Sequence, residues 1–218
     1  MKKKLKFLFF VSFFALTFPA NASILDILSP GDIVTVKYIG PNGVTASGIY
    51  VGPYSFLVNG QPVDLVCNDP YEDDQISPGN EWQAVISFYD DLSRTRFGAR
   101  PNAAELYGLI GILDQDIFAV GPTSYADDHT ALLNFVDPTF KMTAGAPARQ
   151  SWAQAQYAGG ADLSRNIWLT PMSEGNQELG GLRATATPEP APAASFLIGI
   201  GLMTVGLGNR RRRGQRRE

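Results

Sequence analysis

The chain has 218 residues, a length that is enough for one ordinary globular domain. It carries 18 basic and 21 acidic side chains, with a net charge of −3. The charge is segregated, because residues 23–187 hold 8 basic and 19 acidic side chains while both ends of the chain are basic. A central part this acidic repels phosphate groups, which excludes nucleic acid and anionic lipid as its partners.

The first 22 residues have the layout of a secretory signal peptide. Four lysines lie within the first six residues, and an apolar stretch over Leu5–Phe18 follows them. Ala20 and Ala22 place small residues at the −3 and −1 positions of a cleavage site after Ala22. A retained N-terminal anchor is the alternative, but this stretch is shorter than the roughly 20 residues that a spanning helix needs. We therefore expect the chain to be exported.

Two β-hairpins are predicted next, each with an Asn-Gly pair between its strands. The first joins Asp32–Ile39 to Val44–Val51, and the second joins Tyr54–Val58 to Val63–Cys67. β-Branched residues are frequent in these segments, as is typical of strands.

The next elements change from strand to helix and back to strand. Alternating apolar residues predict a half-buried strand over Trp82–Phe88. Helical spacing of apolar residues follows over Asn102–Phe118, with Asn102 as the expected cap, and then over Ser124–Val136 and Pro147–Tyr157. Asn166–Thr170 is predicted to be a returning strand.

This order predicts one exported α+β domain over residues 23–178, in which a β-sandwich or barrel-like sheet carries a helical insertion. Gly180 and Gly181, followed by alternating Ala and Thr, predict a flexible linker over residues 179–187. The remaining residues, 188–218, form a tail with three ordered features.

Pro188, Glu189 and Pro190 open the tail, and the two prolines keep its backbone extended and remove amide donors. The uncharged stretch over residues 191–208 predicts a single transmembrane helix. A basic cluster over residues 210–217 would keep the end of the chain cytoplasmic, and it begins with Arg210, Arg211, Arg212 and Arg213.

This tail resembles the PEP-CTERM sorting signal, whose motif matches Pro188-Glu189-Pro190. The resemblance implies that a membrane-embedded exosortase recognises the tail and processes the chain there. The protein would be held transiently in the inner membrane and then reach the cell envelope or the extracellular space. A permanent membrane anchor is the alternative.

The exported part resembles bacterial thioester adhesin domains and exported PEP-CTERM proteins related to them. The matching residues are Gly48–Tyr54, Val66–Asp69, Gly79–Ala84, Thr170-Pro171 and Gln177-Glu178.

The resemblance implies that Cys67 is a nucleophile that attacks a glutamine carboxamide, expels ammonia and leaves an internal thioester for amine capture. It implies a helical glutamine two residues before Ala131, but His129 stands there and its imidazole has no acyl carbon. Gln115 and Gln156 lack the sequence context of the family's glutamine.

Cys67 and His129 are the single cysteine and the single histidine, which excludes an internal disulfide and a zinc site built from these ligands. A free cysteine after an apolar strand is most often a small buried residue, with a reactive thiol as the alternative. Asp127 and Asp128 precede His129 on a predicted helix, which favours a solvated polar face.

Asp69, Glu72, Asp73 and Asp74 form an acidic loop whose carboxylates suit Ca²⁺. Their spacing lacks the Asp-x-Asp-x-Asp-Gly pattern of a dedicated calcium loop. A solvated turn is therefore favoured over a calcium-dependent adhesion module.

Together these features predict an exported cell-envelope or extracellular-matrix protein that needs no cofactor and is not an enzyme. Its expected partners are other matrix proteins or extracellular polysaccharide, besides the exosortase. The alternative is a thioester-type covalent adhesin or a cysteine-based enzyme that uses Cys67.

Overall fold

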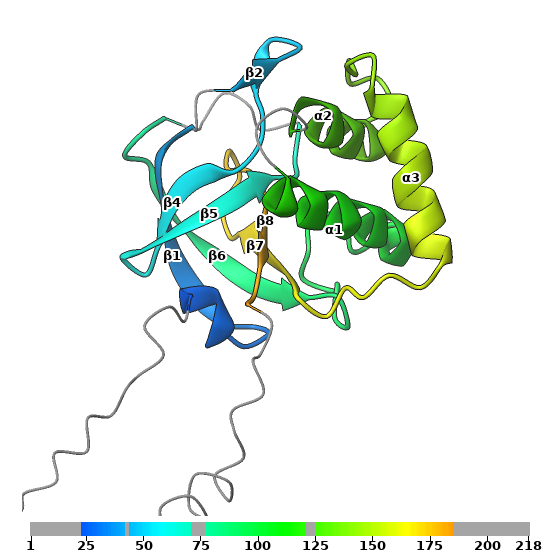
Figure 1. The fold of residues 1–218 in the computed structure, drawn as a ribbon. Helices are drawn as coiled ribbons and strands as arrows, with labels where there is room; N and C mark the ends of the chain where they lie inside the picture. Colours follow the sequence, from blue (N-terminus) through cyan, green and yellow to red (C-terminus); the bar gives the residue numbers. More distant parts are fainter. Residues whose placement is uncertain (1–22, 42–43, 71–76, 121–124, 185–218) are drawn as a thin grey trace, which may run out of the picture. The chain divides into compact units, whose positions relative to one another are not determined.

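The computed structural model of the chain describes residues 23–41, 44–70, 77–120 and 125–184. Within these residues, a closed antiparallel β-barrel lies against a layer of three α-helices, as Figure 1 shows. The α+β class and the helical insertion are confirmed, and the sheet is a barrel and not a sandwich. The helices lie in the chain between two neighbouring barrel strands, β6 and β7.

The barrel strands are antiparallel to each of their neighbours. In order around the barrel they are β1 (Ile33–Pro41), β4 (Tyr54–Val58), β5 (Gln61–Cys67), β8 (Leu179–Leu182), β7 (Asn166–Pro171) and β6 (Glu81–Phe88). A short 3-10 turn, η1 (Ile24–Asp26), precedes β1 and contributes Leu25 to the barrel core.

The first predicted hairpin is wrong. Strand β1 pairs with β4 and β6, whereas β2 (Thr45–Ala46) and β3 (Ile49–Tyr50) pair with each other. The reason is local, because Ser47 and Gly48 both have positive φ, at 52° and 89°. The chain therefore turns back on itself between β2 and β3 before it can extend along β1.

The second predicted hairpin is confirmed as β4 and β5. Asn59 and Gly60 have φ values of 49° and 79°, which is the pair of positive angles that a type I′ turn requires. The strand predicted over Trp82–Phe88 is also confirmed, with Trp82, Ala84 and Ile86 buried.

The helices are α1 (Ala103–Ala119), α2 (Tyr125–Val136) and α3 (Ala146–Ala158). Each predicted helix is thus present. Asn102 precedes α1 but makes no side-chain capping hydrogen bond, because its backbone does not adopt the extended conformation that a capping residue needs. Helix α1 is buried along most of its length, which is why it forms despite Gly108 and Gly111.

Residues 179–182, expected as the start of a linker, form strand β8 and complete the barrel. Gly180 is required for packing there, because a Cβ at this position would overlap the carboxylate of Asp114 and the amide of Asn68. Two glycines that resemble linker residues in sequence are therefore part of the packed core.

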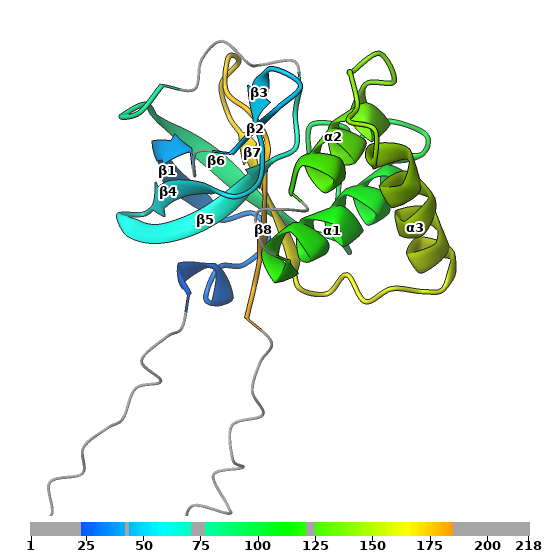
Figure 2. The same cartoon turned by 45° about the horizontal axis from the view of Figure 1, so that its top comes forward.

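Two apolar clusters hold the layers together, one inside the barrel and one between barrel and helices. Alternation along a strand divides residues between them, since Leu65 points into the barrel while Val66 faces the helices. Ile167 and Trp168 divide in the same way on β7. Figure 2 shows the helices on one side of the barrel, with α1 directly against it.

The predicted signal peptide, residues 1–22, and the predicted tail, residues 188–218, lie outside the described residues, as does most of the predicted linker. Among the described helices, none is long and apolar enough to cross a membrane.

Candidate functional site

Cys67 ends strand β5 at the point where this strand changes partners. Most of β5 pairs with β4, whereas Val66 pairs with Gly180 and Cys67 with Leu179 of β8. Cys67 is 4% exposed, which confirms a buried cysteine. The change of partner brings its thiol beside the residues that precede β8.

Gln177 is the side chain that meets this thiol. It lies 110 residues from Cys67 in the sequence, and its Oε1 accepts a hydrogen bond from Cys67 Sγ. Gln177 is 5% exposed. The amide of Asn68 donates to the carbonyl oxygen of Glu178 at 2.9 Å, so the backbones that carry the two side chains are bonded to each other.

Glu178 anchors the segment that carries Gln177. It is completely buried, and its carboxylate accepts hydrogen bonds from the Tyr107 hydroxyl, the Thr170 hydroxyl at 2.5 Å and the Arg96 amide at 2.8 Å. Burial raises the pKa of Glu178, and these hydrogen bonds oppose that rise. Displacing Gln177 would therefore disturb the hydrogen bonds that the buried carboxylate of the next residue, Glu178, accepts.

Arg96 holds the backbone on both sides of the Cys67–Gln177 pair. Its guanidinium forms an ion pair with Asp69, whose side chain is buried. Its Nη2 donates to the carbonyl oxygen of Asn176 at 3.1 Å. Because Asp69 follows Cys67 by two residues and Asn176 directly precedes Gln177, one cation fixes both segments.

His129 is 1% exposed, so the prediction of a solvated polar face is wrong. This face of α2 is turned toward the end of β5, where it meets the barrel. The amide of Gly52 donates to Nδ1 at 2.9 Å. The ring proton is therefore on Nε2, which donates to the carbonyl oxygen of Cys67 at 2.8 Å. Burial lowers the pKa of His129 to about 4, which keeps the imidazole neutral near pH 7.

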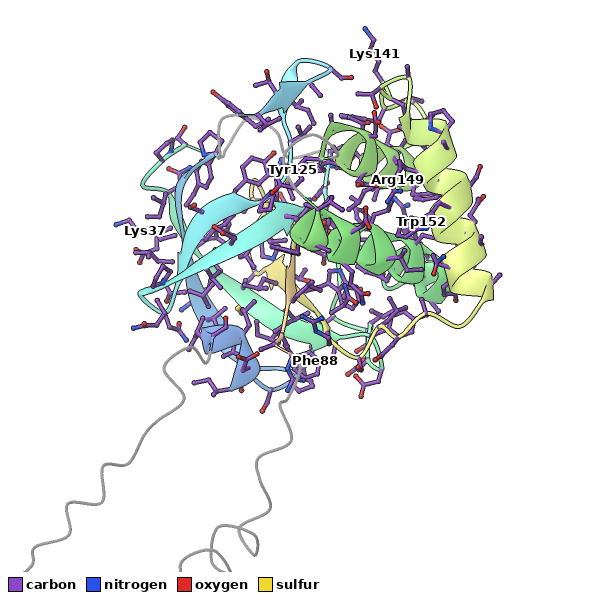
Figure 3. The ribbon with its side chains drawn as sticks, in the orientation of Figure 1. Lys37, Phe88, Tyr125, Lys141, Arg149 and Trp152 are labelled. Carbon is purple, nitrogen blue, oxygen red and sulfur yellow. The ribbon has the colours of Figure 1, made fainter. Side chains whose placement is uncertain are left out.

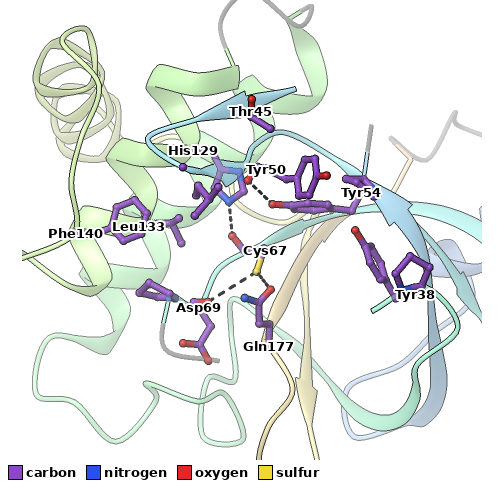
Figure 4. A pocket seen from close by; sticks show the side chains of 15 residues that line it. Tyr38, Thr45, Tyr50, Tyr54, Cys67, Asp69, His129, Leu133, Phe140 and Gln177 are labelled. Carbon is purple, nitrogen blue, oxygen red and sulfur yellow. Dashed lines mark hydrogen bonds between the residues drawn. The ribbon is translucent and has the colours of Figure 1, made fainter. Parts of the chain in front are cut away.

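A cavity of about 500 Å³ lies beside the pair, and both Cys67 and Gln177 line it. A cavity of this size accepts a long side chain or a small molecule. Three tyrosines, Tyr38, Tyr50 and Tyr54, line one side of the cavity, and the apolar side chains of Leu133 and Phe140 line another (Figure 4).

The three tyrosines of the cavity contact one another. Tyr54 donates its hydroxyl to the carbonyl oxygen of Tyr50 at 2.5 Å, and its ring meets that of Tyr38 edge to face. Burial, with smaller effects of Cys67 and Tyr50, raises the pKa of Tyr38 to about 12. The Tyr38 hydroxyl therefore stays protonated near pH 7 and can donate a hydrogen bond within the cavity.

The structure brings Cys67 and His129 into one site, but through the Cys67 carbonyl and not through the thiol. The other two glutamines considered from the sequence lie elsewhere. Gln115 donates to the carbonyl oxygen of Asp162 at 2.8 Å, and Gln156 lines a separate pocket against the helices.

Of the calcium candidates, Asp69 is engaged by Arg96. Glu72, Asp73 and Asp74 lie outside the described residues. Within the residues that the structure describes, no group of three or more His, Cys, Asp or Glu side chains could hold a metal ion. The signal cleavage site, the sorting motif and the basic cluster also lie outside the described part of the chain.

Gln177 is the residue of the site that sequence reasoning missed. The sequence offers Gln177-Glu178 only as the end of a resemblance, directly before a predicted linker. The signal that could have identified it is the short run Leu179–Leu182, because a strand there must pair with another strand and carry Gln177 to that partner.

Comparison of the sequence with known protein families and with curated proteins finds no match. Among solved structures, the chain is similar to the N-terminal thioester domain of a surface protein from Clostridium perfringens, with 9% identity and a TM-score of 0.37. The likeness covers 67% of this chain and 97% of that domain. A likeness of this degree assigns neither a family nor an activity, so the chemistry of the site must come from its own geometry.

Proposed function

We propose that Cys67 and Gln177 form an internal thioester, and that the exported domain uses it to capture an amine on a partner outside the cell. The observation that carries this proposal is the contact between Cys67 Sγ and Gln177 Oε1 inside the protein. A buried free cysteine with only a packing role is a small apolar residue among apolar neighbours, whereas here a carboxamide is held against it.

Formation of the thioester needs no further reactant. Cys67 loses its proton and Sγ attacks Cδ of Gln177, and the C–N bond of the carboxamide then breaks. The departing nitrogen takes up the proton, so that ammonia leaves and the Sγ–Cδ acyl bond remains. Arg96 and Glu178 support this step because they hold both reacting segments in place before reaction.

In the capture of a partner, the sulfur of Cys67 is the leaving group and no longer the nucleophile. An amine that enters the cavity attacks Cδ of Gln177, the Sγ–Cδ bond breaks, and Cys67 leaves as a thiolate that takes up the proton released by the amine. The product is an amide between Gln177 and the partner. Each molecule reacts once, so the protein is proposed as a covalent adhesin and not as an enzyme with turnover.

Burial of the pair supports a thioester that survives until a partner arrives. Cys67 and Gln177 are both at most 5% exposed, and the cavity provides the route to them. Low exposure of the pair limits the contact of the acyl carbon with bulk water and slows its hydrolysis. An amine on a long flexible side chain can reach a carbon at this depth, whereas a folded surface cannot.

Intact-mass spectrometry of the purified processed protein tests the proposal. We expect a mass lower than that of the sequence by one ammonia molecule, and we expect methylamine to add to the protein and to release one titratable thiol. Cys67→Ala and Gln177→Ala should each abolish both effects. Gln156→Ala, which removes a glutamine far from the thiol, is the matched control and should retain them. A wild-type mass equal to the sequence mass, with no methylamine adduct, contradicts the proposal and leaves a matrix role without covalent chemistry.

The proposal also includes export and sorting, which rest on the sequence of the two ends. The signal peptide would deliver the domain across the inner membrane, and an exosortase would act at Pro188–Pro190. Deletion of Pro188–Pro190 should leave the chain at full length in the membrane fraction, as judged by immunoblotting of fractionated cells. Normal processing of the deleted chain would exclude the sorting signal.

A further inference from the structure

We propose that His129 is a positioning residue for the Cys67–Gln177 reaction: its neutral imidazole braces the Cys67 carbonyl against the Gly52 amide and does not act as the base. This role rests on the thioester proposed above and assigns a function to the single histidine of the chain. His129 is the side chain next to the thiol that ordinary cysteine chemistry would use as a base. The geometry gives it a different task.

Both ring nitrogens of His129 are already engaged by backbone groups. Nδ1 accepts from the Gly52 amide at 2.9 Å, and Nε2 donates to the Cys67 carbonyl oxygen at 2.8 Å. A base needs a nitrogen lone pair that faces the proton to be removed. The one available lone pair, on Nδ1, faces Gly52, so the imidazole cannot take the proton of the Cys67 thiol without losing this contact.

The same two bonds join three separate segments at the nucleophile. His129 lies on α2, Cys67 ends β5, and Gly52 lies between β3 and β4. Gly52 has φ of +90°, and a Cβ there would overlap the ring of Tyr125 on α2. The backbone of Gly52 therefore lies directly against α2, in a place that fits only a residue without a side chain.

The ring itself is fixed from the side by Tyr54, whose ring meets it edge to face at 6.1 Å between centroids. Fixing the ring fixes the Cys67 carbonyl oxygen, while the Asn68 amide of the same peptide group donates to the Glu178 carbonyl oxygen. The peptide group that follows Cys67 is therefore held at both ends. His129 also lines the cavity wall. The buried imidazole thus holds the backbone that carries the thiol while it closes one side of the cavity.

A glutamine side chain carries one acceptor atom and one donor atom, as a neutral imidazole does, and this similarity supplies the test. We expect His129→Leu to lower the fraction of chains that carry the thioester at a fixed time after synthesis by about tenfold or more, because two buried backbone groups lose their partner. His129→Gln should recover this fraction to within about threefold of wild type. Peptide mapping of the methylamine-labelled protein gives the fraction in which Gln177 carries the acyl group, and circular dichroism shows whether each variant folds.

A second measurement does not depend on a variant that folds. Nitrogen chemical shifts of the single histidine in the wild-type protein should show the proton on Nε2 and no titration between pH 8 and pH 5. A midpoint near 6.5, or a proton on Nδ1, would overturn the inference.

The outcomes separate this inference from the proposed function. A thioester that is present in wild type and is lost equally in His129→Gln and His129→Leu identifies a base and overturns the positioning role alone. A thioester present at wild-type level in folded His129→Leu also overturns it alone. A wild-type protein without the thioester overturns the proposed function, and the positioning role with it.

Discussion

Burial shifts the pKa values of titratable side chains in two opposite directions in this domain. Burial raises the pKa of Asp114 and Glu178, and raises that of Asp128 to about 6, whereas it lowers the pKa of His129 to about 4. A raised carboxyl pKa stabilises the folded state at low pH, and this contribution is lost as the pH rises through the folded value. A lowered histidine pKa acts in the opposite direction.

The contribution of His129 can be isolated by comparing wild type with His129→Gln. Between pH 6.5 and about 4, an unfolded histidine binds a proton that folded His129 does not bind, so stability falls as the pH drops through this window. We expect the free energy of unfolding of wild type to fall relative to that of the variant by about 3 kcal/mol from pH 7 to pH 4. Urea unfolding at several pH values measures this difference. Parallel curves for the two proteins would mean that His129 is not buried in its neutral form.

The same residue shows how far the sequence could be taken. Cys67 could be singled out because it is the only cysteine and follows an apolar strand. The burial of His129 could not, because Asp127 and Asp128 beside it suggest solvent, whereas Asp128 is in fact buried against Arg149. An ion pair with a residue in a different helix leaves no local pattern in sequence.

At the scale of whole elements, turn residues in the sequence predicted strand pairing only where the turn itself determines which strands pair. The Asn59-Gly60 turn fixed one hairpin correctly because its two positive φ angles are a property of those residues. The pairing of β1 with β4 and β6 could not be predicted in this way, since it depends on how the barrel closes.

Strand β8 is the element whose omission concealed the proposed acyl donor, Gln177. Its glycines suggested a linker, yet Gly180 is needed for close packing against Asp114. Because Gln177 reaches Cys67 only when β8 pairs with β5, missing the strand meant missing the glutamine. The helical position singled out by the resemblance is occupied by His129, which contacts the Cys67 backbone instead.

Arg96 provides a test of how the segments around the site are held. Arg96→Ala leaves the buried Asp69 without its ion pair, and we expect a loss of about 3–5 kcal/mol in the free energy of unfolding. The thioester fraction should fall with it, because the segments that carry Cys67 and Gln177 are then no longer tied together. Chemical unfolding and intact mass report these two effects separately.

Arg149→Ala is the matched control for this prediction. Arg149 pairs with Asp128 and Asp116 in the helical layer and stacks on Trp152 (Figure 3), so its removal should cost similar stability. The thioester fraction should nevertheless stay near that of wild type. Equal losses of thioester in the two variants would show that the fraction follows general stability and not the position of Arg96.

For the whole molecule, the proposed bond is a covalent cross-link between β5 and the segment before β8. It joins residues that are 110 positions apart in sequence and encloses the helical layer. Closing a loop of about 100 residues in the unfolded chain stabilises the folded state by about 4–5 kcal/mol in the chain-entropy estimate. Capture of an amine opens this loop.

We therefore expect methylamine to lower the thermal midpoint of the wild-type protein by several degrees, by roughly 4 °C or more. Cys67→Ala has no cross-link to lose, so its midpoint should not respond to methylamine. Calorimetry of both proteins with and without methylamine makes the comparison. An unchanged midpoint in wild type, with the adduct verified by mass, would mean that the bond does not stabilise the fold.

The place of Gln177 also determines how tension would pass through an attached molecule. A captured partner would be bonded to residue 177, and the compact unit of the chain ends at Arg183, before the C-terminal tail. For a molecule held at that tail, a pulling force runs only through residues 177–183. Strand β8 is the one barrel strand on this path. The other described barrel strands and the helices stay outside it, so the covalent attachment would not depend on their resistance to mechanical unfolding.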